Sequence, residues 1–91
     1  MGTYHLLKKV TLSASRHQAT GNTRHYRNDR EIPPPSELKI VSYSNDQGYY
    51  LLYLDAQGNE LTDTYHESVE SAMEQAAWEF NVLPDDWKNS S

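Results

Sequence analysis

The sequence predicts an α+β domain in which an antiparallel sheet of three or four strands carries one C-terminal helix on one face. Three observations lead to this fold class. Residues 37–65 are rich in strand-forming residues and are interrupted by two short turn segments. One segment of helical period follows them, and a segment of alternating character lies near the N-terminus.

Length and composition fit a single small domain over residues 1–91. The mean hydropathy of −0.88 leaves no run that could span a membrane, while 11% aromatic residues exceed what a disordered tail carries. Because the chain has no cysteine, disulfide frameworks, thiolate zinc sites and cysteine nucleophiles are excluded. Residues 1–12 lack the apolar core of a secretory signal, so a cytoplasmic protein is expected.

The first strand is expected over residues 3–12, where polar and apolar residues alternate with a period of two. Its apolar side holds Tyr4, Leu6, Val10 and Leu12. Lys8 falls on this apolar side and is its one charged residue, so it does not fit the pattern.

Residues 13–36 form a polar, basic excursion that ends in three prolines. A loop of this length in a compact domain is typically functional or mobile. A hairpin turn at residues 21–22 would set Arg16 opposite Arg27, and like charges across strands repel. We therefore expect a loop here, closed by a stiff polyproline connector.

An antiparallel meander is expected to follow, with strands over residues 37–44, 49–54 and 60–65. The connecting segments, residues 45–48 and 55–59, each begin with Asn or Asp and carry Gly late. This chemistry is typical of four- and five-residue hairpin loops.

A helix is expected over residues 69–80, with Ser68 as its N-cap and Asn81 as its left-handed C-cap. Its single apolar stripe consists of Val69, Ala72, Met73, Ala76 and Phe80. Pro84 then suits a short final turn before Trp87.

The stretch from Gly48 to Phe80, GYYLLYLDAQGNELTDTYHESVESAMEQAAWEF, resembles short, acidic, mostly uncharacterised bacterial proteins. In these, a hairpin of the pattern YLxYxDxxGxExTDTxHxSxExA leads into one helix. The resemblance covers about a third of the chain, and its motif positions are turn and cap residues. Some proteins of this kind are immunity partners of secreted toxins, so the resemblance implies protein binding and no catalytic residue.

Both faces of the predicted meander are apolar, whereas the chain has one helix to cover them. We assign to the helix the aliphatic face, joined by the apolar side of the first strand if that strand pairs: Leu38, Ile40, Leu52, Leu54 and Leu61. The opposite face is expected to be an interface, and comprises Val41, Tyr43, Tyr49, Leu51 and Tyr53. Three occupants remain open: residues 13–36 themselves, a second copy of the chain, or another protein.

Trp78 lies opposite the apolar stripe of the helix, among Glu67, Glu70, Ser71 and Glu74. Either the C-terminal tail covers it through Leu83 and Trp87, or it is exposed as an anchor. An exposed Trp among acids would suit a basic partner, such as the surface of a nucleic-acid-binding toxin.

No catalytic, metal or cofactor site is expected. Asp63, His66 and Ser68 resemble a catalytic set, but Asp63 and His66 point to opposite faces of a strand. His17 and His25 lack the spacing that preorganises metal ligands, and are expected to be polar loop residues.

Charge is divided unevenly along the chain. Residues 1–36 carry six basic and two acidic side chains, whereas residues 37–91 carry two basic and eleven acidic ones. The two halves could attract each other, or the basic half could bind nucleic acid through Arg16, Arg24, Tyr26, Arg27 and Arg30. A net charge of −5 opposes nucleic-acid binding. We therefore expect a non-enzymatic protein-binding domain of the immunity or inhibitor type, with nucleic-acid binding as the alternative and no membrane partner.

Overall fold

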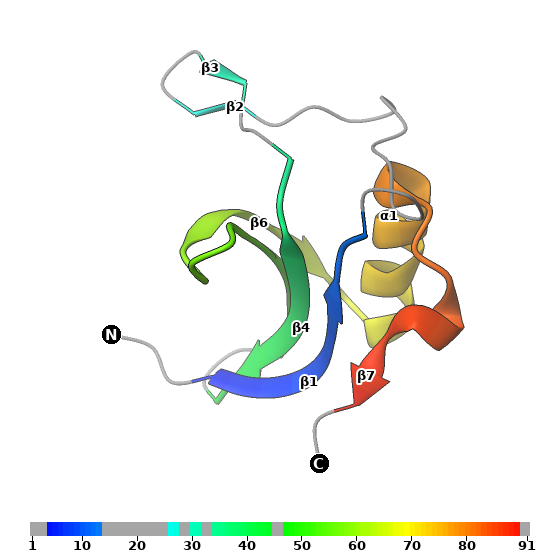
Figure 1. Ribbon diagram of the computed structural model, residues 1–91. Coiled ribbons are helices and arrows are strands. Elements are labelled where there is room, and N and C mark those ends of the chain that lie inside the picture. Colours follow the sequence, from blue (N-terminus) through cyan, green and yellow to red (C-terminus); the bar gives the residue numbers. More distant parts are fainter. Residues whose placement is uncertain (1–3, 14–25, 28–29, 32–33, 45–46, 90–91) are drawn as a thin grey trace.

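The computed structural model describes residues 4–13, 26–27, 30–31, 34–44 and 47–89, which contain a sheet with one helix against it (Figure 1). The sheet is antiparallel, has five strands and follows the order β6-β5-β4-β1-β7. Its strands are β1 (Tyr4–Thr11), β4 (Glu37–Tyr43), β5 (Tyr49–Leu54), β6 (Glu60–His66) and β7 (Lys88–Asn89). The predicted α+β class is confirmed, with one strand more than expected.

The β5–β6 hairpin is closed by the predicted loop at residues 55–59. The Asp55 carboxylate accepts the backbone N–H groups of Gln57 and Asn59 at 3.0 and 2.8 Å. These bonds lower the pKa of Asp55. Gly58 supplies the positive φ of 86° that the turn requires.

Helix α1 (Val69–Phe80) has the predicted limits and caps. The Ser68 side chain accepts the N–H of Ser71 at 3.0 Å, and Asn81 adopts the left-handed conformation with φ 60°. Beyond the helix, η1 (Pro84–Asp86) is the predicted final turn. None of the helices in the described ranges is long and apolar enough to cross a membrane.

A β-bulge next to Lys8 in β1 moves the apolar residues before it to the face opposite the helix, while Lys8 itself stays on the side of Val10. Leu6 pairs with Val41 and Lys8 with Ile40, so the register shifts between them. Leu6 and Lys8, which would share a face in a regular strand, therefore point to opposite faces. The expectation that Tyr4 and Leu6 face the helix is wrong, because they pair with Tyr43 and Val41 of the opposite side, whereas Val10 and Leu12 join the main core as expected.

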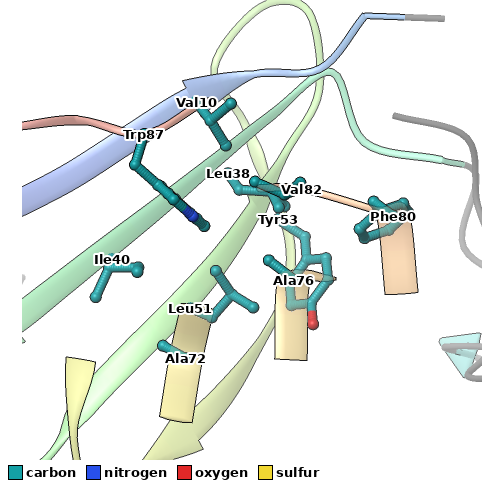
Figure 2. Packing of buried hydrophobic residues seen from close by; sticks show 10 residues of the cluster. All are labelled: Val10, Leu38, Ile40, Leu51, Tyr53, Ala72, Ala76, Phe80, Val82 and Trp87. Atoms are coloured by element: carbon teal, nitrogen blue, oxygen red, sulfur yellow. The ribbon is translucent and has the colours of Figure 1, made fainter. Parts of the chain in front are cut away.

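The main core lies between the sheet and α1, and two chain segments close it. Helix α1 contacts β5 and β6, while the C-terminal tail covers β1 and β4 with Val82 and Trp87 (Figure 2). Trp87, which follows the predicted final turn, is 7% exposed and belongs to the core. The buried members are Val10, Leu38, Ile40, Leu51, Tyr53, Ala72, Ala76, Phe80, Val82 and Trp87.

The predicted face assignment is wrong for β5. Leu38 pairs with Tyr53 and Ile40 with Leu51, so Leu51 and Tyr53 share the helix side with Leu38 and Ile40. Tyr49 packs there too, whereas Leu52 and Leu54 belong to a second cluster on the opposite side. Both sets of alternate residues in β5 are apolar, so only the pairing register decides which set faces the helix. Leu61 is the extra residue at a register shift in β6.

A small hairpin lies within the basic excursion. β2 (Tyr26–Arg27) pairs with β3 (Arg30–Glu31), and Arg27 stands opposite Arg30. The expectation of a loop throughout residues 13–36 is wrong for these four residues, which pair with each other. Most of the excursion lies outside the described residues, and with it the expectation that it folds over the sheet.

Candidate interaction surface

Four tyrosines form a row across the face of the sheet opposite α1, which we call the open face. Their rings meet edge to face, with centroids 6.0 Å apart for Tyr4–Tyr43, 5.3 Å for Tyr43–Tyr50 and 5.3 Å for Tyr50–Tyr65. Such pairs contribute about 0.5–1.5 kcal/mol each beyond the area that they bury. This tyrosine row connects β1, β4, β5 and β6.

The aliphatic residues beneath the row are closed off, contrary to the expectation of an uncovered apolar patch. Val41, Leu52 and Leu54 are 0–3% exposed, with Leu6, Tyr43 and Tyr50 packed against them. The strands curl so that α1 lies on their convex side, which makes the open face concave (Figure 1). Side chains on a concave face converge, and the tyrosines therefore lie close over the aliphatic layer.

The predicted interface residues are divided by the structure. Val41 and Tyr43 belong to the open face, although Val41 is buried. Tyr49, Leu51 and Tyr53 lie on the helix side, and the last two are at most 1% exposed. These three residues cannot line the open face, because the register of β5 turns them toward α1.

The exposed aromatic side chains lie elsewhere than predicted, with one exception. Tyr65 in β6 is 53% exposed, Trp78 in α1 is 50% exposed, and Tyr4 is 36% exposed. Of these, only Trp78 was among the predicted interface residues. Tyr65 was missed because its polar strand, ELTDTYH, offers no apolar pattern that marks it.

Strand β6 and the outer side of α1 form a strongly acidic region. Residues 40–87 contain no Lys or Arg. Five exposed acids lie on these two elements and their junction, and we call them the acidic edge: Glu60, Asp63, Glu67, Glu70 and Glu74. Two of these acids also act on the tyrosine row. Burial raises the pKa of Tyr43, and the negative charges of Glu60 and Asp63 raise it further.

Polar contacts hold α1 alongside β6. His66 meets Ser71 near the start of the helix at 3.0 Å, and the Tyr53 hydroxyl donates to the buried Glu79 near its end at 2.5 Å. His66 also meets the Thr64 hydroxyl at 2.8 Å. The helix therefore packs against both strands, with Ser71 beside β6 and Glu79 against Tyr53 of β5.

The candidate catalytic set is not assembled. Asp63 pairs with Leu52 of the open face, His66 points to the helix side, and Ser68 caps the helix. The hydroxyls that reach His66 belong to Thr64 and Ser71, and neither residue was part of the candidate catalytic set. Burial lowers the pKa of His66, so the ring is neutral near pH 7. Both of its nitrogens contact hydroxyl groups. This arrangement fastens β6 to α1. Among the described residues, no group of three His, Asp or Glu side chains could hold a metal ion.

Trp78 lies on the outer side of α1, opposite the buried stripe of Ala72, Ala76 and Phe80. The C-terminal tail does not pack over it in the predicted manner, because Trp87 enters the core and Leu83 is 58% exposed.

The alternative nucleic-acid residues lie largely beyond what the structure describes. Arg16 and Arg24 fall outside the described ranges, as do His17 and His25. The other three contribute only described backbone, in the β2–β3 hairpin: Tyr26, Arg27 and Arg30.

Comparison with known proteins adds no relative: no family model, no curated protein and no solved structure matches this chain. The resemblance to short acidic bacterial proteins therefore stays a prediction.

Proposed function

We propose that this protein is a small, non-enzymatic domain that binds a basic protein through its acidic edge. One observation carries the proposal: two exposed aromatic side chains, Tyr65 of β6 and Trp78 on the outer side of α1, lie on the same two elements as five exposed acids. The cytoplasmic location expected from the sequence belongs to the same proposal.

The combination of rings and acids suits a protein interface. Tyr and Trp supply large, rigid contact area and are enriched among residues that dominate binding energies. Acids around them speed encounter with a basic partner and oppose acidic ones. The affinity should therefore fall as the salt concentration rises.

The charge favours a different protein over a second copy of this chain. Two acidic edges brought together would repel, since no Lys or Arg lies between residues 40 and 87 to compensate. An immunity or inhibitor role is the finer form of the proposal. Carboxylates arranged around aromatic rings could occupy a toxin surface that normally binds the phosphates of a nucleic acid.

The test compares the wild type with a double variant, Tyr65→Ser with Trp78→Ser, and with Leu83→Ser. Leu83 is also exposed but belongs to the C-terminal tail, so Leu83→Ser is the matched control. Proteins of the source organism retained by immobilised wild type would be identified, purified and titrated by calorimetry. We expect a basic partner whose affinity falls at least about tenfold with the double variant and is unchanged with the control, a loss of about 1.4 kcal/mol.

A basic partner that binds both variants as well as the wild type would contradict the proposal. Nucleic-acid binding is tested in parallel by titrating a labelled single-stranded oligonucleotide at low salt. We expect no shift, because the acidic edge repels phosphates. A salt-dependent shift that is lost on Arg24→Ser with Arg27→Ser would favour the alternative.

A further inference from the structure

The outer side of β6 is an open sheet edge. β6 ends the strand order, and its inner side pairs with β5 from Tyr49↔His66 to Leu54↔Glu60. Among the residues that the structure describes, no strand pairs with the outer side of the segment from Thr62 to His66. An edge strand presents a row of backbone N–H and C=O groups, which an extended segment of another chain can pair with.

The opposite edge of the sheet has a different character. There β7 pairs with Lys8 and Lys9 of β1, and the Lys8 ammonium donates to the Asn89 side chain at 2.5 Å. The strands at this edge carry Lys8, Lys9 and Lys88, and β7 is the protein's own C-terminal strand. Because β6 carries Glu60 and Asp63 and no lysine, β6 is the edge that would accept a basic strand.

The two sides of β6 offer different contacts to an added strand. On the open face, Glu60 and Asp63 pair with Leu54 and Leu52 of the apolar cluster, and Tyr65 ends the tyrosine row. On the helix side, Thr62 and Thr64 oppose Tyr53 and Leu51 of the main core. Side chains of an added strand alternate between these two sides.

We propose that an extended, basic segment of the partner adds to the outer edge of β6 as a sixth strand. Its Lys or Arg side chains, at every second position, would lie toward Glu60 and Asp63 beside Tyr65. The intervening side chains would lie toward Thr62 and Thr64 on the helix side. This rests on the proposed function and adds the shape of the ligand to it: a β-strand of alternating basic residues.

A second copy of this chain is the poorer occupant. Antiparallel pairing of two β6 strands would bring Glu60 and Asp63 of both copies to one face, and like charges across strands are unfavourable. The basic edge of another copy is already occupied at Lys8 and Lys9 by β7.

The probe is a capped peptide as long as β6 that alternates Lys with Thr. Two control peptides separate strand pairing from charge. In one, Pro replaces each Thr, which keeps the charge but removes donors and strand geometry. In the other, Glu replaces each Lys, which keeps the strand propensity but reverses the charge.

Binding is followed by NMR titration of the whole chain and by amide hydrogen exchange of β6. We expect the Lys–Thr peptide to shift resonances of β6 and to slow exchange of its outward amides, with binding that weakens as salt is added. The Lys–Pro peptide should bind at least about tenfold more weakly, and the Glu–Thr peptide should not bind.

Two variants with the same charge change localise the effect. Asp63→Lys should abolish binding of the Lys–Thr peptide, whereas Asp85→Lys should preserve it, because Asp85 lies in η1 beside β7. Folding of both variants is checked by the dispersion of the amide resonances.

Several results would overturn strand addition. These are equal binding of the Lys–Thr and Lys–Pro peptides, shifts centred away from β6, or no binding of either peptide. β6 amides already protected in the free monomer would mean that another part of this chain occupies the edge, and a mass that rises with concentration would mean that a second copy does. A captured partner that needs Tyr65 and Trp78 but leaves β6 exchange unchanged would preserve the proposed function and refute this inference alone.

Discussion

The ring of Tyr65 lies directly against the backbone of Gly48. A Cβ atom on Gly48 would overlap the Cε1, Cζ and hydroxyl oxygen atoms of that ring. Gly48 is buried and precedes β5, and its φ is not in the left-handed region, unlike that of Gly58. Close packing, and not backbone conformation, therefore requires glycine at position 48.

Gly48→Ala should displace the Tyr65 ring and destabilise the fold by about 1–3 kcal/mol. Because the clash is with one side chain, adding Tyr65→Ala should recover part of the loss. The measurement is denaturant unfolding of both single variants and the double variant, which gives a coupling energy of about 0.5–3 kcal/mol for residues in contact. Simple additivity of the two substitutions would contradict the packing assignment.

Gly58→Ala is the matched control for that cycle. It should also destabilise, by about 1 kcal/mol, because alanine resists the positive φ of 86°. A methyl group at position 58 would have no atom within 4 Å of it, so Tyr65→Ala should not rescue this variant. Gly58→Asn should cost less than Gly58→Ala, since Asn tolerates the left-handed conformation.

Tyr53→Phe should destabilise the protein although it removes a single oxygen atom. The Tyr53 hydroxyl donates to Glu79, which is only 3% exposed, and the variant deprives a buried carboxylate of this donor. The expected loss is about 1–3 kcal/mol. Denaturant unfolding measures it, with Tyr49→Phe in the same strand as control. A further change of Glu79→Leu in the Tyr53→Phe variant should recover stability, because no buried carboxylate then remains.

The elements of this fold could be predicted from the sequence because their signals are local. Ser68 and Asn81 fix the helix ends through their own caps, and the loop after Asp55 carries its own hydrogen bonds and glycine. Such features depend on few neighbours. Strand and helix boundaries therefore lie within about two residues of the expected ones.

The arrangement of these elements depends on non-local pairing, which the pattern does not contain. Every residue of β5 is apolar, so its parity could not show whether Leu51 or Leu52 faces the helix. The bulge after Leu6 reverses the facing of β1, and β7 is a two-residue strand with no signal of its own. The predicted interface consequently included core residues and missed Tyr65.

Lowering the pH from neutral should weaken the fold through His66. Burial lowers its pKa below the usual 6.5, with the charge of Glu79 opposing the effect. Below pH 6.5 the unfolded chain therefore binds a proton at this ring more readily than the native protein does, so the free energy of unfolding falls with decreasing pH. Urea unfolding between pH 7.5 and 5 measures this against His66→Gln, which should show a flatter dependence.

His5→Gln is the control for the His66 experiment. His5 is exposed in β1, so folding does not bury its ring. This variant should retain the pH dependence of the wild type. If His5→Gln flattens the curve and His66→Gln does not, the burial of His66 is not the source of the effect.

Raising the pH above 10 should weaken the fold through Tyr53. Burial and the hydrogen bond to Glu79 both raise the pKa of this phenol well above its usual value of 10.0. Above pH 10 the unfolded chain loses the phenolic proton while native Tyr53 keeps it, so the free energy of unfolding falls as the pH rises. A single group of this kind contributes a slope of at most about 1.4 kcal/mol per pH unit. Denaturant unfolding at several alkaline pH values should show a steeper decline for wild type than for Tyr53→Phe.

Adding Tyr43→Phe should flatten the alkaline decline in the free energy of unfolding further, because burial and the nearby Glu60 and Asp63 raise the pKa of Tyr43 in the same direction. Phenolate absorbance in the folded protein gives an independent check: a first ionisation step that includes Tyr53 would refute its burial against Glu79.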